Sequence, residues 1–166
     1  MRRRRMGNAV LESAMLIPVA LALLIGTAQL GKIVYTYSML QKTMLTLARY
    51  LGTQQGVNFC DPQDPSVAAA VNYALTGQTD SADNPLIIGL TPDMFHIRVE
   101  RYDPQAQQVV ECDCSATGCD PTQGGLAPGF LAVSLTDGYP VRPVFWGFSV
   151  SALALHPAVR VPYAGT

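Results

Sequence analysis

The feature that most constrains this chain is a segment without charged residues, residues 13–31, which follows four arginines and one glutamate. As an α-helix, a segment of this length spans about 28 Å, close to the thickness of the hydrocarbon core of a bilayer. The arginines at positions 2–5 favour retention of the N-terminal end in the cytoplasm. The sequence therefore predicts a helix that crosses a membrane once, with the rest of the chain on the outer side.

Glu12 stands at the start of this apolar segment. A charged side chain on a membrane helix costs about 3 kcal/mol on insertion scales, so Glu12 needs a partner or a position at the membrane surface. One interpretation places it among the lipid headgroups, near the arginines. The other is a processing site, in which cleavage after Gly7 makes Asn8 the new N-terminus and Glu12 the fifth residue of the mature chain.

The order of these features resembles the class III signal of type IV pilins and pseudopilins: a basic leader, a glycine, a glutamate five residues later and a long apolar helix. The resemblance implies that a prepilin peptidase cuts after Gly7 on the cytoplasmic side. It also implies that Glu12 pairs with the free amine of a neighbouring subunit, because a buried carboxylate and a buried ammonium each need an opposite charge. The expected partners are prepilin peptidase, the inner membrane and other pilin-like subunits, contacted through the N-terminal helix.

Within that superfamily the sequence is most similar to TadE-like pseudopilins of tight-adherence pilus systems. The similarity is carried by residues 7–18, 29–31, 34–35 and 47–50. It covers about the first fifty residues, and later only residues 131–135 and 139–141 lie near the place of the family's late strands. Ser13 stands where the family often has an aromatic residue, and the four cysteines are not a family signature.

Two other interpretations use the same residues. A secretory signal peptide could be cut after Ala28, because Gly26, Thr27 and Ala28 are small enough for a signal peptidase site. An uncleaved signal anchor would keep the same topology, but it gives no reason for the spacing between Gly7 and Glu12.

The helical pattern continues beyond the apolar segment. Apolar residues recur at spacings of three or four, which predicts an amphipathic helix that packs on the chain's own C-terminal domain: Ile33, Tyr37, Leu40, Met44, Leu47 and Leu51. One helix is expected over residues 9–54, with a kink or local melting at Pro18. The predicted division is a basic leader (1–7), a transmembrane helix (8–31), its amphipathic continuation (32–55) and an extracytoplasmic α+β domain with disulfides (56–166).

The C-terminal domain is predicted as a small antiparallel sheet with one short helix. The helix is expected over residues 67–75, capped by Ser66 and ended by Gly77. Period-two alternation predicts strands at 94–102, 108–114, 130–136 and 149–156, the last extended by 159–163. The fold class is therefore α+β, a long N-terminal helix packed on a small antiparallel β-sheet, as in pilins.

Charge and composition exclude several functions. The formal net charge of −1 becomes −5 when the arginines at positions 2–5 are removed, which argues against a nucleic-acid partner.

The candidate catalytic residues have ordinary structural interpretations. His96 and His156 lie in strand-like segments and are interpreted as strand residues. Asp61 and Asp64 belong to an ordinary Asp-Pro loop. Residues 80–84 lack the central glycine and the closing glutamate of a calcium loop. No enzymatic activity, cofactor, metal or small-molecule substrate is expected.

The cysteines fall in the part of the chain that is expected outside the inner membrane. Four cysteines in an oxidising compartment predict two disulfides. The favoured pairing is Cys114–Cys119 with Cys60–Cys112, and the alternative is Cys112–Cys119 with Cys60–Cys114. A structural zinc site is a weaker interpretation, because the paired two-residue spacing of zinc ligands is missing.

These observations predict a pilin-like structural subunit, minor or accessory, in a tight-adherence or related type IV filament or secretion apparatus. It would reside in a bacterial inner membrane as a single-pass protein with its C-terminal domain outside, or enter an extracellular filament. The alternatives are the main filament subunit, or a periplasmic binding module on an uncleaved signal anchor. The contact surface of such a module would be the loop 78–85 or an aromatic cluster: Tyr139, Phe145, Trp146 and Phe148.

Overall fold

The structure is a computed structural model, and it describes residues 2–61, 63–112, 128–145, 148–149 and 151–165. Of residues 2–11 and 144–149 within this range, only the backbone is described. The helices are α1 (Arg2–Gly52), α2 (Pro65–Thr76) and the short 3-10 helix η1 (Pro92–Met94). The fold class is α+β, as predicted: a long N-terminal apolar helix, a four-stranded antiparallel sheet and small additional strand pairs.

The chain divides into two compact units. The helix unit contains Met1–Thr36 and Val141–Leu153, and the domain unit contains Tyr37–Pro140 and Ala154–Thr166. Helix α1 contributes to both and continues through Pro18 without interruption, so the predicted local melting at this proline is wrong. A proline removes one backbone hydrogen bond, and the turns on either side of it can keep the helix continuous.

The second half of α1 forms part of the core of the domain unit. Leu40, Met44, Leu47 and Leu51 are fully buried, which confirms the predicted packing of the amphipathic stripe on the chain's own domain. Tyr37, at the start of this unit, keeps 37% of its surface exposed. Ile33 is half-buried as well, so the stripe is fully buried only from Leu40 onward.

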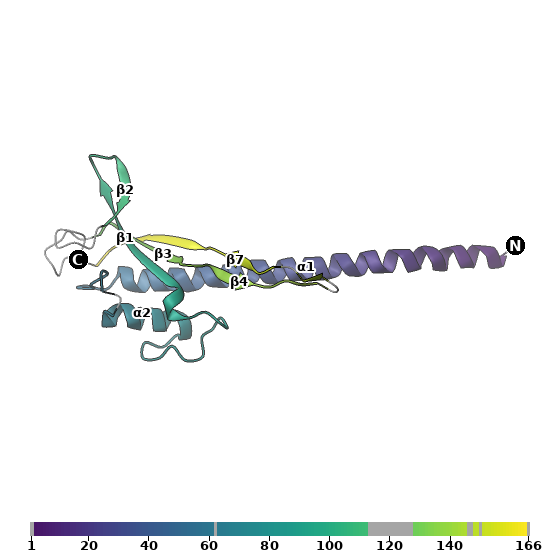
Figure 1. Cartoon of the computed structure of the whole chain (residues 1–166), viewed down its shortest axis with the longest axis horizontal. Coiled ribbons are helices and arrows are strands. Elements are labelled where there is room, and N and C mark those ends of the chain that lie inside the picture. The colour runs from purple at the N-terminus through teal and green to yellow at the C-terminus, as the bar shows by residue number, and fades with distance from the viewer. Residues whose placement is uncertain (1, 62, 113–127, 146–147, 150, 166) are drawn as a thin grey trace. The chain divides into compact units, whose positions relative to one another are not determined.

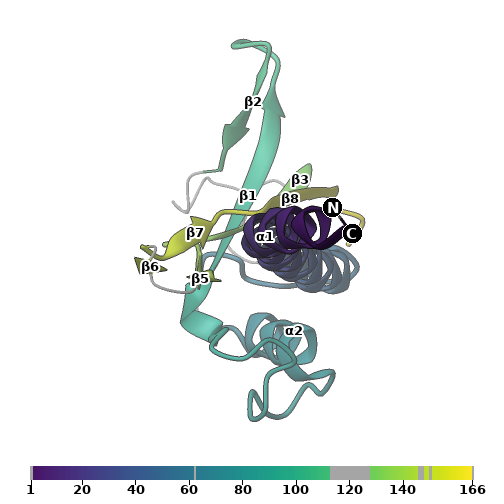
Figure 2. The same ribbon diagram turned by 90° about the vertical axis from the view of Figure 1, so that its right-hand side faces the viewer.

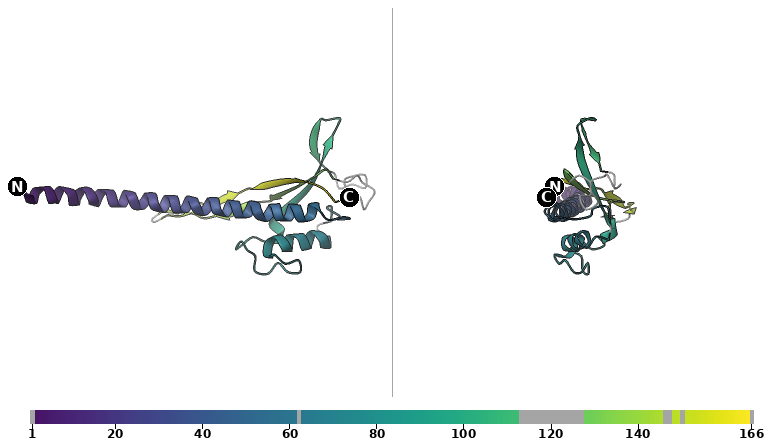
Figure 3. Two further views of the ribbon diagram at one scale, coloured as in Figure 1. Left: turned by 180° about the vertical axis from the view of Figure 1, so that it is seen from behind. Right: turned by 90° about the vertical axis from the view of Figure 1, so that its left-hand side faces the viewer.

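The main sheet has the strand order β2-β1-β3-β8, and all its neighbours are antiparallel. Its strands are β1 (Phe95–Asp103), β2 (Gln108–Glu111), β3 (Phe130–Leu135) and β8 (Ala158–Pro162). Alternate residues of β3 are buried on one face, as predicted: Leu131, Val133 and Leu135. Figures 1 and 2 show α2 and the tip of the β1–β2 hairpin at opposite ends of β1, and Figure 3 shows the same arrangement from behind.

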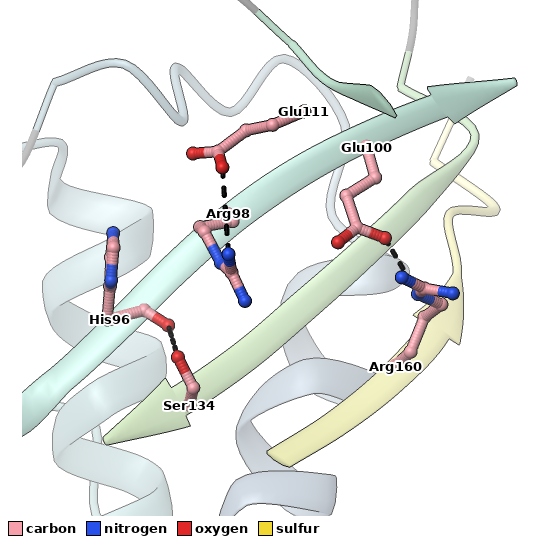
Figure 4. Close-up of polar contacts among 6 residues, drawn as sticks. All are labelled: His96, Arg98, Glu100, Glu111, Ser134 and Arg160. Carbon is pink, nitrogen blue, oxygen red and sulfur yellow. Dashed lines mark hydrogen bonds and ion pairs between the residues drawn. The ribbon is translucent and has the colours of Figure 1, made fainter. Parts of the chain in front are cut away.

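The other face of the sheet carries paired charges (Figure 4). Glu100 is only 7% exposed, and its Oε2 lies 2.7 Å from Nε of Arg160 on β8. Arg98 lies 3.6 Å from Glu111 of β2. Each ion pair bridges two strands, so the long charged side chains cover this face with balanced charge.

The predicted fourth strand over residues 149–156 is wrong. Two short strands occur instead, β6 (Phe148–Ser149) and β7 (Leu153–Leu155), with Ser151 and Ala152 outside any strand. β6 pairs with β5 (Val144–Phe145), and β7 pairs with β4 (Tyr139–Val141). The fourth strand of the main sheet is the separate β8, which follows the buried Pro157 and pairs with β3.

Helix α2 begins two residues earlier than predicted. Its cap is Asp64, whose Oδ1 accepts hydrogen bonds from the backbone N–H groups of Ser66 (2.8 Å) and Val67 (3.4 Å). Pro65 explains the difference, because proline is favoured at the first helical position and thus moves the cap to residue 64. Gly77 ends the helix as predicted, in a left-handed conformation with φ of 80°.

The C-terminal residues cap the end of α1. The backbone N–H groups of Ala164 and Gly165 both donate to the carbonyl oxygen of Gly52, at 2.9 and 3.0 Å. The Tyr163 hydroxyl donates to the carbonyl oxygen of Gln54 at 2.9 Å. These bonds satisfy carbonyl groups that the end of a helix leaves without an intrahelical partner.

Candidate assembly helix

The helix unit contains the candidate site, because its part of α1 presents apolar side chains to the surroundings. These side chains are 53% to 71% exposed: Met15, Leu16, Ile17, Val19, Leu21, Leu23, Leu24, Leu30, Val34 and Tyr35. Many are adjacent in sequence, and adjacent residues of an α-helix point about 100° apart. From Met15 to Leu24 the apolar surface therefore surrounds the helix, which is typical of a helix covered by lipid or by other helices.

The same helix is long and apolar enough to cross a membrane. The stretch Glu12–Gly52 contains an 18-residue window with a mean hydropathy of 1.9, and none of this window is buried. A signal sequence near an N-terminus passes the same test, so length and composition support membrane insertion without distinguishing an anchor from a cleaved signal.

Two threonines in the helix unit's part of α1 bond to the helix itself. The Thr27 hydroxyl donates to the carbonyl oxygen of Leu24 at 3.0 Å, and the Thr36 hydroxyl donates to that of Lys32 at 2.9 Å. A threonine that bonds to its own helix can enter an apolar environment without leaving an unsatisfied hydroxyl. These residues are thus compatible with a membrane.

Glu12 differs from these threonines. Its side chain is exposed at the edge of the apolar surface, and no side chain that the structure describes forms an ion pair with it. Gly7 and Asn8 lie within the α-helical backbone of α1. The three predicted processing and assembly residues thus share one helix, with the carboxylate next to the apolar segment.

Two glycines in this part of α1 face open space. A Cβ atom added to Gly26 or Gly31 would meet no atom within 4 Å. Packing inside the chain therefore does not require a glycine at either position. In membrane helices, small residues allow the backbone of a neighbouring helix to approach closely.

The predicted cysteine pairings extend beyond the described residues. Cys60 and Cys112 are described, and neither is a free thiol. Cys114 and Cys119 lie outside the described residues, so the connectivity stays a prediction. Within the described part of the chain, no cluster of three histidine, cysteine or acidic side chains could hold a metal ion.

The comparison with protein families decides how the N-terminal segment is classified. Residues 7–49 match the family described as TadE-like protein. The N-terminal segment is TadE-like. The matched range begins at Gly7 and ends in the last turns of α1, so it contains Asn8, Glu12 and the whole exposed apolar surface. No match was found among curated proteins or solved structures.

The TadE-like match associates the chain with Tad pilus components and with the membrane. TadE-like proteins are structural pilus components and are not an enzyme family. The match leaves out the domain unit beyond the end of α1. The TadE-like match therefore concerns α1 and not the sheet or α2.

Sequence reasoning missed one concave feature in the domain unit. A groove of about 510 Å³ is lined by residues of α2, the loop before α2, η1 and the start of β1. Neither of the contact surfaces predicted from the sequence coincides with it. The loop 78–85 is not among its lining residues, and the predicted aromatic cluster includes Trp146, which lies outside the described residues.

Proposed function

We propose that this chain is a pilin-like subunit, minor or accessory, of a tight-adherence filament or secretion apparatus. In this proposal a prepilin peptidase cuts after Gly7, and the mature chain assembles through the N-terminal part of α1. The folded domain remains on the outer side of the inner membrane, or on the filament surface.

The observation that carries the proposal is the exposed apolar surface around α1. Water solvates such a surface poorly, at a cost of about 25 cal/mol for each Å² of apolar area. Lipid can cover it before assembly, and the apolar helices of neighbouring subunits can cover it afterwards. A helix suited to both environments is what a subunit needs if it moves from a bilayer into a filament.

Glu12 supplies the polar contact of this assembly. When the helix leaves the membrane surface for a bundle of apolar helices, the carboxylate loses water and needs a positive partner. The amine of Asn8 on a neighbouring subunit, created by cleavage after Gly7, is the proposed partner. The domain is further stabilised by two disulfides among Cys60, Cys112, Cys114 and Cys119.

The proposal is tested by the intact mass and N-terminal sequence of the protein isolated from its native envelope. We expect a chain that begins at Asn8. A chain that begins at Gln29 would contradict the proposal, because a signal peptidase would then have removed the helix. An intact chain beginning at Met1 would instead favour the signal-anchored binding module.

The role of Glu12 is tested separately by Glu12→Gln. We expect normal membrane insertion and a severe loss of incorporation into assembled material, measured by cross-linking between subunits, because the neutral amide cannot pair with the ammonium of Asn8. The matched control is Asp137→Asn, an exposed acid of the domain unit, which should assemble normally. Assembly of the Glu12→Gln variant at the level of the unmodified chain would contradict the proposed pairing.

A further inference from the structure

The loop between α2 and η1, residues 77–91, presents two large apolar side chains to the surroundings. Ile88 is 89% exposed and Leu86 is 67% exposed, the two highest values among the large apolar side chains described in the domain unit. Ile87 between them is only 9% exposed, and Leu90 is only 1% exposed. The loop therefore buries Ile87 and Leu90 in the domain and leaves the other two uncovered.

The loop holds Ile88 at the corner of a tight turn. The Leu90 N–H donates to the carbonyl oxygen of Ile87 at 3.1 Å, and Gly89 has a φ of 84°. These features define a β-turn with Ile88 at its second position and glycine at its third. The Tyr139 hydroxyl donates to the carbonyl oxygen of Ile88 at 2.6 Å, which connects the turn to β4. The exposure of Ile88 is thus a property of a turn that the domain holds in place.

The register of the sheet places this turn at one end of the domain. The C-terminal end of β8 lies at the end of α1, because Ala164 and Gly165 donate to the carbonyl oxygen of Gly52. β3 is antiparallel to β8 and β1 is antiparallel to β3, so the paired residues Phe95 and Leu135 lie at the opposite end of the sheet. The turn and η1 directly precede Phe95 in the chain. The turn therefore lies at the end of the sheet farther from Gly52.

This is the end at which α1 enters the domain. β3 extends about 17 Å from Phe130 to Leu135, and α1 extends about 18 Å from Gly52 back to Leu40. Figures 1 and 3 show β3 following this part of α1, with the loop after α2 on the side from which α1 runs toward the N-terminus. The Ile88 turn therefore lies near the level of Leu40, where the amphipathic stripe becomes fully buried.

The length of α1 brings this end of the domain close to a bilayer. Lys32 is the first charged residue after the apolar segment, and the helix from Lys32 to Leu40 is about 12 Å long. The headgroup layer extends about 5–8 Å beyond the hydrocarbon core. Membrane helices are tilted by about 20° on average, which moves one side of an attached domain toward the bilayer. The turn that carries Ile88 is thus at the height where side chains reach the lipid surface.

We propose that the turn at residues 86–90 is a second lipid contact of this chain, in which Leu86 and Ile88 enter the headgroup region of the outer leaflet. Removal of their exposed apolar surface from water drives the contact. No lysine or arginine occurs in residues 77–94, and Asp80 and Asp83 are exposed. Because anionic lipids attract basic segments, this contact suits a zwitterionic lipid surface. Together with α1, it holds the domain in one orientation on the bilayer.

The lipid contact rests on the proposed membrane position of α1, but not on cleavage after Gly7 or on the role of Glu12. A reporter at Leu23, within the exposed apolar part of α1, measures the membrane position of the helix in the same vesicles. A failure of the turn to reach lipid is thereby distinguished from a failure of the helix to enter the bilayer.

The experiment uses the full chain in phosphatidylcholine vesicles, with the fluorophore NBD attached to the variant Ile88→Cys. Quenching is measured with phosphatidylcholine that carries a spin label near the start of its acyl chains, the depth that interfacial apolar side chains reach. We expect the fluorescence to fall about threefold relative to vesicles without the spin label. The matched control is Ala106→Cys in the exposed turn between β1 and β2, at the other end of β1, which should keep its fluorescence.

The chemistry of the contact is tested by a second substitution in the chain that carries the Ile88 reporter. Leu86→Asp should remove most of the quenching, because a carboxylate opposes insertion among lipids. Tyr102→Asp replaces another exposed apolar side chain, close to the turn between β1 and β2, and should leave the quenching unchanged. Anionic phosphatidylglycerol in the vesicles should not strengthen the quenching, and a stronger signal would contradict an apolar contact. Matching circular dichroism spectra and thermal unfolding curves establish that each variant is folded.

Three further results would overturn the lipid contact. The first is an unquenched Ile88 reporter in vesicles where a Leu23→Cys reporter is quenched by lipid spin-labelled at the end of its acyl chains. The second is an Ile88 reporter shielded from both the lipid spin label and aqueous iodide, which would assign the turn to a contact with another protein chain. The third is equal quenching in the folded Leu86→Asp variant. If the Leu23 reporter also stays unquenched, the membrane position of α1 fails, and the proposed filament function fails with it.

Discussion

The two halves of α1 have the same backbone conformation and opposite surroundings. From Met15 to Leu24 the helix exposes apolar side chains on all sides, with Leu23 at 66% and Leu24 at 65% exposure, and from Ile25 to Thr36 one face is half-buried. From Leu40 onward the apolar residues form one buried stripe, while Gln41, Lys42 and Arg49 are exposed on the other faces. The distribution of apolar residues around the helix, and not its helicity, separates the part suited to lipid or other helices from the part suited to a folded domain.

The two halves of α1 also differ in how their side chains are held. The domain half of α1 is held by the chain itself, through its buried stripe and through the C-terminal residues that cap Gly52. In the apolar half, the side chains from Met15 to Leu24 are exposed and are not held by contacts within the described part of the chain. Substitutions in the two halves should therefore affect different measurements.

The largest expected effect is that of Leu47→Ala, because the Leu47 side chain is fully buried in the domain unit. Removing it should lower the free energy of unfolding by about 2–5 kcal/mol, through lost burial and the cavity left behind. The measurement is thermal or denaturant unfolding of the domain in detergent. Leu23→Ala, at a 66% exposed position, is the matched control and should leave domain unfolding unchanged. Equal destabilisation by both variants would refute the division of α1.

An intermediate effect on the stability of the domain is expected for the substitution of Asp64, which caps α2. Burial raises the pKa of the Asp64 carboxyl, but hydrogen bonds from the backbone of Asn58, Ser66 and Val67 and from the Ser66 side chain outweigh it, so the pKa lies below its usual value. Asp64→Ala should therefore reduce the stability of the domain by about 1 kcal/mol at neutral pH. The conformation of the helix unit should not change.

The pH dependence of this effect follows from the lowered pKa. The ionised cap stabilises the fold fully above the pKa of an unfolded aspartate, about 3.9, and this contribution is lost as the pH falls through the lower folded value. The stability difference between the unmodified chain and Asp64→Ala should shrink in that acidic range. Asp64→Asn keeps a capping side chain without a titrating group, so it should retain most of the stability at neutral pH. A difference that grows on acidification would contradict the assignment.

The smallest effect on the domain is expected for Gly26→Ala. A Cβ atom at Gly26 meets nothing within 4 Å, so the free energy of domain unfolding should change by less than about 0.5 kcal/mol. If neighbouring helices pack against this glycine, cross-linking between chains in a bilayer should fall. Gly138→Ala is the contrasting control, because Gly138 has a φ of 73° and a Cβ there would lie 2.7 to 2.9 Å from the His156 ring. Comparable destabilisation by both variants would argue against an open surface at Gly26.

Local patterns predicted much of the fold. The spacing of Leu40, Met44 and Leu47 predicted both the helix and its buried face, and the alternation in β1 and β3 predicted those strands with small errors at their ends. These predictions succeed because one buried face imposes a period on neighbouring residues. The predicted cap of α2, Ser66, lies two residues after the observed cap, Asp64. Pro65 indicates the correct position, because proline is favoured at the first helical position.

The failures concern contacts between distant residues. The segment 149–156 alternates like a strand, yet β8 after Pro157 occupies the edge of the sheet beside β3. The groove was missed for the same reason, since α2 and β1 each show an ordinary pattern and only their juxtaposition leaves Ile97 beside an apolar wall. The cysteine pairings, by contrast, stay predictions.

The sequence by itself determined the long helix, its change from an apolar surface to an amphipathic stripe, and the TadE-like pattern from Gly7 to Glu12. Each of these depends on residues within a few turns of one another, where local geometry fixes which side chains share a face. Only the tertiary structure decided that β8 joins β3, that Ala164 and Gly165 cap Gly52, and that the start of β1 and α2 line one groove. These features depend on which distant segments pair, and a local pattern shows that a strand can pair without showing with which partner.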